Sequence, residues 1–275
     1  DLVLWPETAI PGHFSFPWVQ KYFNEQVLQG DDFYLLTGLE DSTLEGDEIY
    51  NTITLMKGST ESYQMYKKIH LVPLGEYIPF RDTFPLFQWI AGGIIETDFV
   101  PGSSYETLEI EKDGHAIEII PLICFEDTVP RHARNFMSES PQLFVNVTND
   151  GWFYDSAQPI QHFYNAIFRC IEFRRPMIRA ANTGVSGFVD IRGSIFDRRS
   201  RADENPRILQ DEETGSTYIR GSLPGRLEID LNPPLTVYAK IGDAFSITLG
   251  TIALIVALFG VSRSLRVFRS ESRGK

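Results

Sequence analysis

Cysteine is scarce in this chain, which has only Cys124 and Cys170 among 275 residues. Two cysteines in a chain of this length exclude a disulfide-stapled scaffold, although a single bridge between them stays open. The sequence also has no CxxC motif, no HExxH motif and no paired-histidine spacing, and its five histidines are scattered. We therefore predict that the protein uses no metal and no other cofactor.

Basic residues are sparse outside the C-terminus. The net charge is −12, and the last thirteen residues contribute +4 to it through five basic side chains and Glu271. Residues 1–262 therefore carry a net charge of about −16, which makes this part a poor partner for phosphate backbones. Because no aromatic-basic patch accompanies it, we exclude nucleic-acid binding. The 43% hydrophobic and 23% charged content is typical of a globular protein, not a disordered one.

One long uncharged stretch is present near the C-terminus. Residues 244–262, AFSITLGTIALIVALFGVS, carry no charge. As a helix they would measure about 28 Å, close to the hydrocarbon thickness of a bilayer. A buried core helix is the alternative, but the segment follows Pro233 and Pro234 and leads into a basic tail. We predict a linker over 233–243, a transmembrane helix over 244–262 and a basic cytoplasmic tail over 263–275.

The chain begins with Asp1, within the strand-like DLVLW, and no signal peptide is visible. The rest alternates strand and helix patterns, which predicts a layered α/β domain over 1–232. Helices are predicted at residues 16–30, 128–138 and 158–175. Strands are predicted at the apolar or alternating segments 1–5, 33–38, 48–57, 105–111, 115–124, 143–149, 177–182, 187–191 and 225–231.

Chemically active residues lie at the ends of three of these segments: Glu7 in LWPETA, Lys68 in YKKIHLVPLGEY and Cys124 in ICFED. Taken singly, Glu7 could favour the start of a helix, Lys68 could be a solvated surface lysine and Cys124 a buried thiol. Taken together, a carboxylate base, an ammonium ion and a thiol could form and transfer an acyl thioester. Water as the second nucleophile gives a hydrolase, and an amine gives an N-acyltransferase.

The ordered motifs WPE, KxxLVPxGEY, CFE and NDGWF resemble the nitrilase (carbon–nitrogen hydrolase) superfamily. Within it, KIHLVPLGEYIPFR, VTNDGWF, the segment 161–187 and the C-terminal apolar helix are similar to the apolipoprotein N-acyltransferases of bacterial inner membranes. The resemblance implies a nitrilase-like αββα sandwich on the periplasmic side of the inner membrane. It also implies that an N-terminal strand and several membrane helices would precede Asp1.

The resemblance further implies a Glu7 general base, a catalytic Lys68 and a Cys124 nucleophile. It implies supporting active-site carboxylates at Glu76 and Glu126, an aromatic side chain beside the site at Trp152, and an oxyanion donor in the Phe125 backbone N–H. The implied reaction moves a fatty acyl chain from a phospholipid to the N-terminal amine of diacylglyceryl-cysteine in an apolipoprotein.

Residues 81–102 contain a Gly-Gly pair and many apolar side chains without a clear strand period. One interpretation is a loop folded over the core. The other is a mobile arm whose tip, including Trp89 and Ile90, touches the bilayer and admits lipid tails.

Two other functions remain open on the sequence. One is a membrane-anchored amidase or nitrilase acting on a small amide, and the other is a catalytically inactive binding domain on a membrane anchor. Cys170, His70 and His162 are predicted to be structural, and Asn182 and Gly184 are predicted to form a turn that borders the site.

Overall fold

The computed structural model describes residues 1–29, 32–43, 46–81, 83, 97–154, 156–196 and 207–272, with side chains as far as residue 261. These residues form two compact units, Asp1–Leu235 and Thr236–Lys275.

The first sheet of the larger unit has the strand order β1-β2-β3-β4. β1 runs parallel to β2, and the other pairs are antiparallel. Three of these strands match predicted segments, but the fourth was missed because STESYQMYK is largely polar and exposed. The strands are β1 (Leu2–Trp5), β2 (Tyr34–Ser42), β3 (Ile49–Lys57) and β4 (Ser59–Lys67).

The second sheet has the strand order β5-β6-β7-β8-β9. Its three central strands are parallel, and an antiparallel strand closes each edge. The central strands are rich in buried apolar residues, as expected when both faces of a parallel sheet are covered. The strands are β5 (Leu108–Lys112), β6 (His115–Ile123), β7 (Gln142–Asn149), β8 (Met177–Asn182) and β9 (Gly187–Val189).

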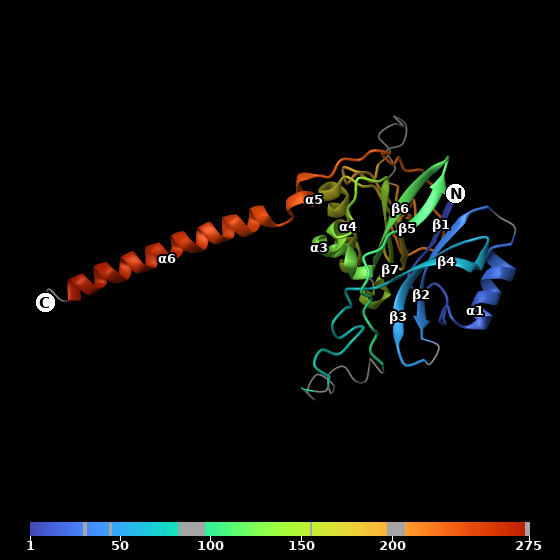
Figure 1. Ribbon diagram of the computed structural model, residues 1–275, viewed down its shortest axis with the longest axis horizontal. Coiled ribbons are helices and arrows are strands. Elements are labelled where there is room, and N and C mark those ends of the chain that lie inside the picture. The colour runs from blue at the N-terminus through green and yellow to red at the C-terminus, as the bar shows by residue number, and fades with distance from the viewer. Residues whose placement is uncertain are drawn as a thin grey trace. The chain divides into compact units, whose positions relative to one another are not determined.

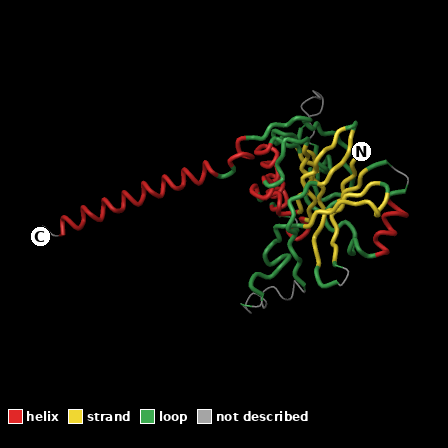
Figure 2. The backbone as a smooth tube through the Cα atoms, in the orientation of Figure 1, coloured by secondary structure: helices red, strands yellow, loops and turns green. Residues whose placement is uncertain are grey.

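The two sheets pack face to face, with β3 against β6, β2 against β7 and β1 against β8. Helix α1 (Pro17–Tyr22) and the π-helical turn η1 (Phe23–Val27) cover the outer face of the first sheet. Helices α3 (Pro130–Arg134) and α4 (Gln158–Phe173) lie on the outer side of the second (Figures 1 and 2). This arrangement confirms the predicted α/β class and its nitrilase-like αββα layering.

Side-chain packing explains why the outer layers stay in place. Val19 and Phe23 of the first helical segment are fully buried against Leu35, Leu39 and Met56 of the first sheet. Burial of such side chains stabilises a domain by about 1.5–3 kcal/mol each. On the other side, Phe163, Ala166, Cys170 and Phe173 form the buried face of α4, which confirms that Cys170 is a core residue.

Two sequence-based predictions need correction. Residues 225–231, GRLEIDL, are irregular and belong to neither sheet. The alternation in the sequence is matched by the burial, since Leu227 and Ile229 are half-buried between exposed neighbours, but the segment forms no strand. The predicted helix over 16–30 is divided into α1 and the π-helical turn that follows it. Trp89 and Ile90 lie outside the described residues.

The smaller unit contains α5 (Val237–Ile241) and α6 (Ala244–Ser272). Ala244–Val261 has a mean hydropathy of 2.3 and is long and apolar enough to cross a membrane. Thr236 caps the start of α5, because its hydroxyl accepts a hydrogen bond from the Ala239 amide at 3.0 Å.

Candidate active site

Most of the predicted catalytic residues follow directly after a strand. Glu7 comes two residues after β1, Lys68 follows β4 and Cys124 follows β6. β1 and β8 face each other across the sandwich, as do β3 and β6. The topology thus carries residues that are far apart in sequence to one end of the two facing sheets.

The turn at Cys124 is unusual. Its φ of 50° places a non-glycine residue in the left-handed region, at the junction of β6 and the 3₁₀ turn η2 (Cys124–Thr128). Such a conformation is costly and is found most often at functional sites. The Asn146 side chain supports the turn by donating from Nδ2 to the carbonyl oxygens of Leu122 at 3.2 Å and Cys124 at 3.3 Å.

Glu7, Lys68, Glu76 and Asn51 form a connected polar cluster. Lys68 Nζ lies 2.7 Å from Glu76 Oε1 and 4.0 Å from Glu7 Oε1. Asn51 Nδ2 donates to Glu7 Oε1 at 2.7 Å and to Glu76 Oε1 at 2.9 Å, so that one amide bridges the two carboxylates. The Asn149 amide donates to Glu7 Oε2 at 2.7 Å and links this cluster to the second sheet.

The position of Glu7 depends on a close approach between two backbones. A Cβ atom at Gly38 of β2 would lie 2.5 Å from the Glu7 Cα atom. Real Cβ atoms essentially never come so close, so any other residue at position 38 would displace the loop that carries Glu7. Gly38 is therefore part of what positions the carboxylate.

Burial and charge set the pKa values of the three groups. Burial raises the pKa of Glu7, and the Lys68 ammonium and the Asn51 hydrogen bond oppose this only in part. Burial lowers the pKa of Lys68, but Glu7, Cys124 and Glu76 outweigh it and raise the pKa above its usual value. Burial and the Glu7 charge raise the pKa of Cys124 to about 12, although Lys68 opposes them. The site therefore combines a thiol that is protonated at neutral pH, a lysine that keeps its positive charge and a glutamate whose basicity is increased.

Glu126 joins the turn at Cys124 to the loop after Lys68. Its Oε1 accepts hydrogen bonds from the Tyr66 hydroxyl at 2.8 Å and from the amides of Ile69 and His70 at 2.8 and 3.0 Å. Its Oε2 accepts from the Ile123 amide at 2.9 Å. Glu126 thus fastens the segment around the thiol to the segment around the ammonium ion, whereas Glu76 contacts the ammonium ion itself.

A second buried charge network lies behind Cys124. Asp127 and Asp150 are fully buried, and His162 of α4 lies between them with Nε2 2.9 Å from Asp127 Oδ1 and Nδ1 2.8 Å from Asp150 Oδ1. Arg179 of β8 pairs with Asp127 and with Asp150, the latter at 3.1 Å. Gly184, with a φ of 111°, makes room for this network, because a Cβ atom there would lie 2.7 Å from Asp150 Oδ2.

The remaining predicted residues lie near the surface. The side chain of Phe125 is 44% exposed and that of Trp152 is 71% exposed, in the turns η2 and η3 (Asp150–Phe153) that follow β6 and β7. Asn182 ends β8 and precedes the turn with Gly184, as the sequence predicted. His162 is a hydrogen-bonded structural histidine, which is also as predicted.

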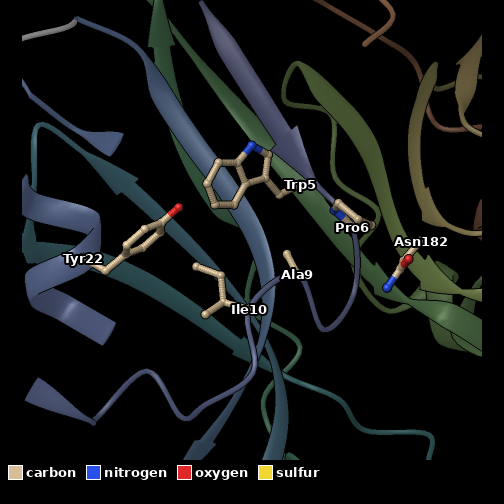
Figure 3. A pocket seen from close by; sticks show the side chains of 6 residues that line it. All are labelled: Trp5, Pro6, Ala9, Ile10, Tyr22 and Asn182. Carbon is tan, nitrogen blue, oxygen red and sulfur yellow. The ribbon is translucent and has the colours of Figure 1, made fainter. Parts of the chain in front are cut away.

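An open apolar hollow of about 350 Å³ lies on the α1 side of the Glu7 loop. Figure 3 shows Tyr22 at one end of the row of lining side chains and Asn182 at the other, with Trp5 between them. Its lining consists of Trp5, Pro6, Ala9, Ile10, Tyr22 and Asn182. Glu7, Lys68 and Cys124 are not part of this lining.

Sequence reasoning missed Asn51, Asn146, Thr148 and Arg179. All four are polar residues inside otherwise apolar strands and are nearly inaccessible to solvent. Because buried polar groups must be hydrogen-bonded, a polar residue in the middle of an apolar strand is itself a signal. That signal was present in YNTITL, FVNVTN and MIRAAN.

No group of three or more His, Cys, Asp or Glu residues in the described part of the chain is arranged to hold a metal ion. The absence of a metal or other cofactor from the reaction stays a prediction. Both cysteines are free thiols in the structure.

The sequence profile of the carbon–nitrogen hydrolase family matches residues 1–211. The chain therefore belongs to the carbon–nitrogen hydrolase family. Among solved structures, it is similar to a CN-hydrolase superfamily protein from Xanthomonas campestris, with 19% identity, a TM-score of 0.48 and coverage of 70% of this chain and 71% of that one.

Among curated proteins, the chain is similar to enzymes named apolipoprotein N-acyltransferase. The protein from Rickettsia prowazekii is 31% identical over 260 residues, which are 93% of this chain and 47% of that protein. The protein from Geobacter metallireducens is 41% identical over 128 residues, 46% of this chain and 23% of that protein. The chain thus spans less than half the length of these relatives.

Proposed function

We propose that the chain is the catalytic part of an N-acyltransferase that moves a fatty acyl group from a phospholipid to the N-terminal amine of diacylglyceryl-cysteine in an apolipoprotein. The observation that carries the proposal is the buried cluster of Glu7, Lys68 and Glu76, in which the charges of Glu7 and Lys68 act on the Cys124 sulfur. The similarity to relatives named apolipoprotein N-acyltransferase supports this choice of reaction.

In the first half-reaction, Glu7 accepts the thiol proton of Cys124 while the sulfur attacks the ester carbonyl carbon of the phospholipid. The carbonyl π electrons move onto oxygen, where Lys68 and the Phe125 backbone N–H stabilise the negative charge. The intermediate then collapses, the carbon–oxygen bond to the glycerol breaks and Glu7 returns the proton to the departing oxygen. Lysophospholipid leaves, and the acyl group remains on Cys124 as a thioester.

In the second half-reaction, the neutral amine of the acceptor attacks the thioester carbonyl. Glu7 takes a proton from the nitrogen, the carbon–sulfur bond breaks and the sulfur departs with the electron pair. Proton transfer from Glu7 to the sulfur restores the thiol. The products are an amide and a lysophospholipid, so that the overall exchange needs no oxidant, reductant or nucleotide.

The pKa directions support this division of roles. A thiol with a pKa of about 12 needs a base to react near neutral pH, and burial makes Glu7 a stronger base than an exposed glutamate. Lys68 stays charged because the surrounding negative groups raise its pKa. It can therefore stabilise an oxyanion throughout the cycle.

We further propose that α6 anchors the domain in the bacterial inner membrane, with residues 1–232 in the periplasm and the basic tail over 263–275 in the cytoplasm. Its apolar length and hydropathy support the anchor, and the basic tail supports this orientation. Trp89 and Ile90 remain candidates for a lipid-contacting arm.

The experiment uses the full chain in detergent micelles, mixed with a phospholipid that carries a labelled acyl chain. We expect label on the peptide that contains Cys124, stable to acid and released by hydroxylamine, and none in a Cys124→Ala variant. Addition of a diacylated lipopeptide with a free N-terminus should move the label to the amine, whereas an N-acetylated lipopeptide should leave it on the enzyme.

Membership in the carbon–nitrogen hydrolase family favours an amidase as the second candidate. The same experiment separates the two. Labelling of Cys124 by a small amide, without labelling by phospholipid, would replace the acyltransferase proposal with the amidase. Absence of labelling from either donor, with Cys124 alkylated no faster than a free peptide cysteine, would indicate an inactive binding domain.

A further inference from the structure

Thr148 lies between the reacting sulfur and a buried carboxylate. β6 and β7 are parallel with Ile123 opposite Val147, which brings the residues that follow these two, Cys124 and Thr148, alongside each other. The Thr148 hydroxyl donates to Asp150 Oδ1 at 3.2 Å, and Thr148 acts on the Cys124 sulfur as a hydrogen-bonding group that lowers the pKa of the thiol. Thr148 is fully buried, so that water does not compete for either contact.

Asp150 does not depend on Thr148 for its hydrogen bonds. Its Oδ1 lies 2.8 Å from His162 Nδ1, and its Oδ2 accepts from Arg179 Nη2 at 3.1 Å. The carboxylate therefore keeps a partner on each oxygen if the threonine hydroxyl turns away. A rotation of this hydroxyl costs little, because it leaves no buried charge without a partner.

We propose that Thr148 is a further catalytic residue, whose hydroxyl donates to Asp150 while Cys124 is a thiol and donates to the sulfur when it carries negative charge. The inference rests on the proposed role of Cys124 as the nucleophile. It adds to Glu7, Lys68 and Cys124 a group that touches the reacting sulfur from the side of the second sheet.

Because the Thr148 hydroxyl has a single proton, it can donate either to Asp150 or to the Cys124 sulfur, but not to both at once. In the resting state the thiol can donate its S–H to Thr148 Oγ1, while the O–H of Thr148 donates to Asp150. After Glu7 has taken the thiol proton, the hydroxyl turns and donates to the sulfur anion. The same bond forms again when the carbon–sulfur bond of the thioester breaks and the sulfur departs with the electron pair.

The charges around the sulfur explain why a hydrogen bond from Thr148 would stabilise the anion. Glu7 and Asp150 both disfavour an anionic sulfur, and Lys68 favours it. His162 and Arg179 neutralise Asp150 from behind, and Asp127 on η2 balances their charge. When the sulfur is anionic Glu7 carries the proton, but the Asp150 charge still opposes the anion, so a hydroxyl donor aimed at the sulfur adds stabilisation to that from Lys68.

The test measures how fast iodoacetamide alkylates Cys124 between pH 6.5 and 9.5. All variants also carry Cys170→Ala, so that Cys124 is the only thiol that can be alkylated. Thr148→Val removes the hydroxyl and keeps the shape of the side chain. We expect its alkylation rate to fall about tenfold at each pH, as for the loss of a hydrogen bond to a charged group. Thr148→Ser restores the hydroxyl and should stay within about threefold of the parent protein.

Thr54→Val is the matched control. Thr54 is fully buried in β3, and its hydroxyl has no hydrogen-bond partner in the described part of the structure. This variant should be alkylated at the parent rate. Thermal unfolding of all variants identifies any loss of folding, and if Thr148→Val does not fold, the comparison of Thr148→Ala with Thr148→Ser takes its place.

Two outcomes would overturn the inference: alkylation of Thr148→Val at the parent rate, or equal slowing in Thr148→Ser, which would show that side-chain packing is responsible. Alkylation needs no acyl donor, so this result is independent of the proposed function. If phospholipid fails to label Cys124 while Thr148→Val still slows alkylation and Thr148→Ser restores it, the acyltransferase proposal fails and the role of Thr148 stands.

Discussion

The ammonium nitrogen of Lys68 lies 2.7 Å from Oε1 of Glu76 and is almost completely buried. Glu76 is in turn tied to its own loop, because its Oε2 accepts a hydrogen bond from the Val72 amide at 2.8 Å. The loop after β4 therefore supplies both the cation and the carboxylate that orients it. Glu7 lies farther from the same ammonium, at 4.0 Å, and its two oxygens accept hydrogen bonds from Asn51 and Asn149.

Glu76→Gln is predicted to slow thioester formation on Cys124 about 100-fold, in the range seen when an oxyanion-stabilising donor is lost or misplaced. The neutral amide no longer holds Lys68, which would move towards Glu7 and reduce its basicity. The measurement is the single-turnover rate with labelled phospholipid, alongside a thermal melt. Glu106→Gln is the matched control, because it makes the same carboxylate-to-amide change at an exposed position. This variant should form the thioester at the parent rate. A rate for Glu76→Gln within threefold of the parent would contradict the assigned role.

Asn51→Leu is predicted to shift the acid limb of the pH–rate profile by about one unit towards higher pH. The Asn51 hydrogen bond lowers the pKa of Glu7, so that its removal raises that pKa and protonates the base over a wider range. Activity should therefore fall more at pH 6 than at pH 8. Thr54→Val, on the same strand, should leave the profile in place. A uniform loss at all pH values would show that Asn51 acts on folding or packing instead.

Much of the fold could be predicted from the sequence, because the apolar patterns of the strands and helices agree with the residues that start or stop these elements. The run HAIEIIPLIC predicts β6, and the helical spacing followed by Pro176 predicts α4, which ends at Phe173 and is capped by Arg174 in the left-handed conformation. β4 escaped prediction because most of its residues are polar and its middle part is exposed, although Thr60 and Tyr66 are buried. The segment 225–231 has the period of a strand but finds no partner, and pairing is a tertiary property that a local pattern does not contain.

The candidate site was only partly readable for a related reason. Glu7, Lys68 and Cys124 stand next to strand ends, where a linear motif marks them. The residues that hold them in place, such as Asn51 and Thr148, act across strands, and their partners depend on register. A contact such as Asn51 with two carboxylates 44 and 25 residues away follows from the folded sheets and not from any local spacing.

Glu126 is predicted to make stability fall as pH rises from about 4.5 to about 7. Burial raises its pKa in the folded protein to about 7, from an ordinary value of 4.5, although hydrogen bonds from Ile123, His70 and Tyr66 oppose the shift. Between these values the folded state binds more protons than the unfolded state, so that each rise in pH favours unfolding.

Glu126→Gln is expected to remove this component. Urea titrations at several pH values should give a slope that differs from the parent by at most about 1.4 kcal/mol per pH unit in this window, the limit for one proton. Glu109→Gln, an exposed change on β5, should keep the parent slope. Identical slopes for Glu126→Gln and the parent would contradict a buried carboxyl that titrates near neutrality.

His162 is predicted to act in a higher pH window. Burial lowers its pKa, but Asp127 and Asp150 outweigh this and raise the pKa to about 9. A histidine whose folded pKa is raised above its ordinary value of 6.5 gives stability that is complete below pH 6.5 and is lost as pH rises to about 9. The unfolding free energy of the parent protein should therefore fall across this range.

His162→Gln is expected to lose this dependence, because glutamine cannot carry the positive charge that lies between Asp127 and Asp150. The variant should be less stable than the parent at pH 6.5, and the difference should narrow towards pH 9, since the parent loses its advantage there. His115→Gln, an exposed change at the start of β6, serves as the control in the same urea titrations. A constant difference between His162→Gln and the parent across the range would mean that the imidazole is neutral in the network. The two buried aspartates would then rely on Arg179 alone for positive charge.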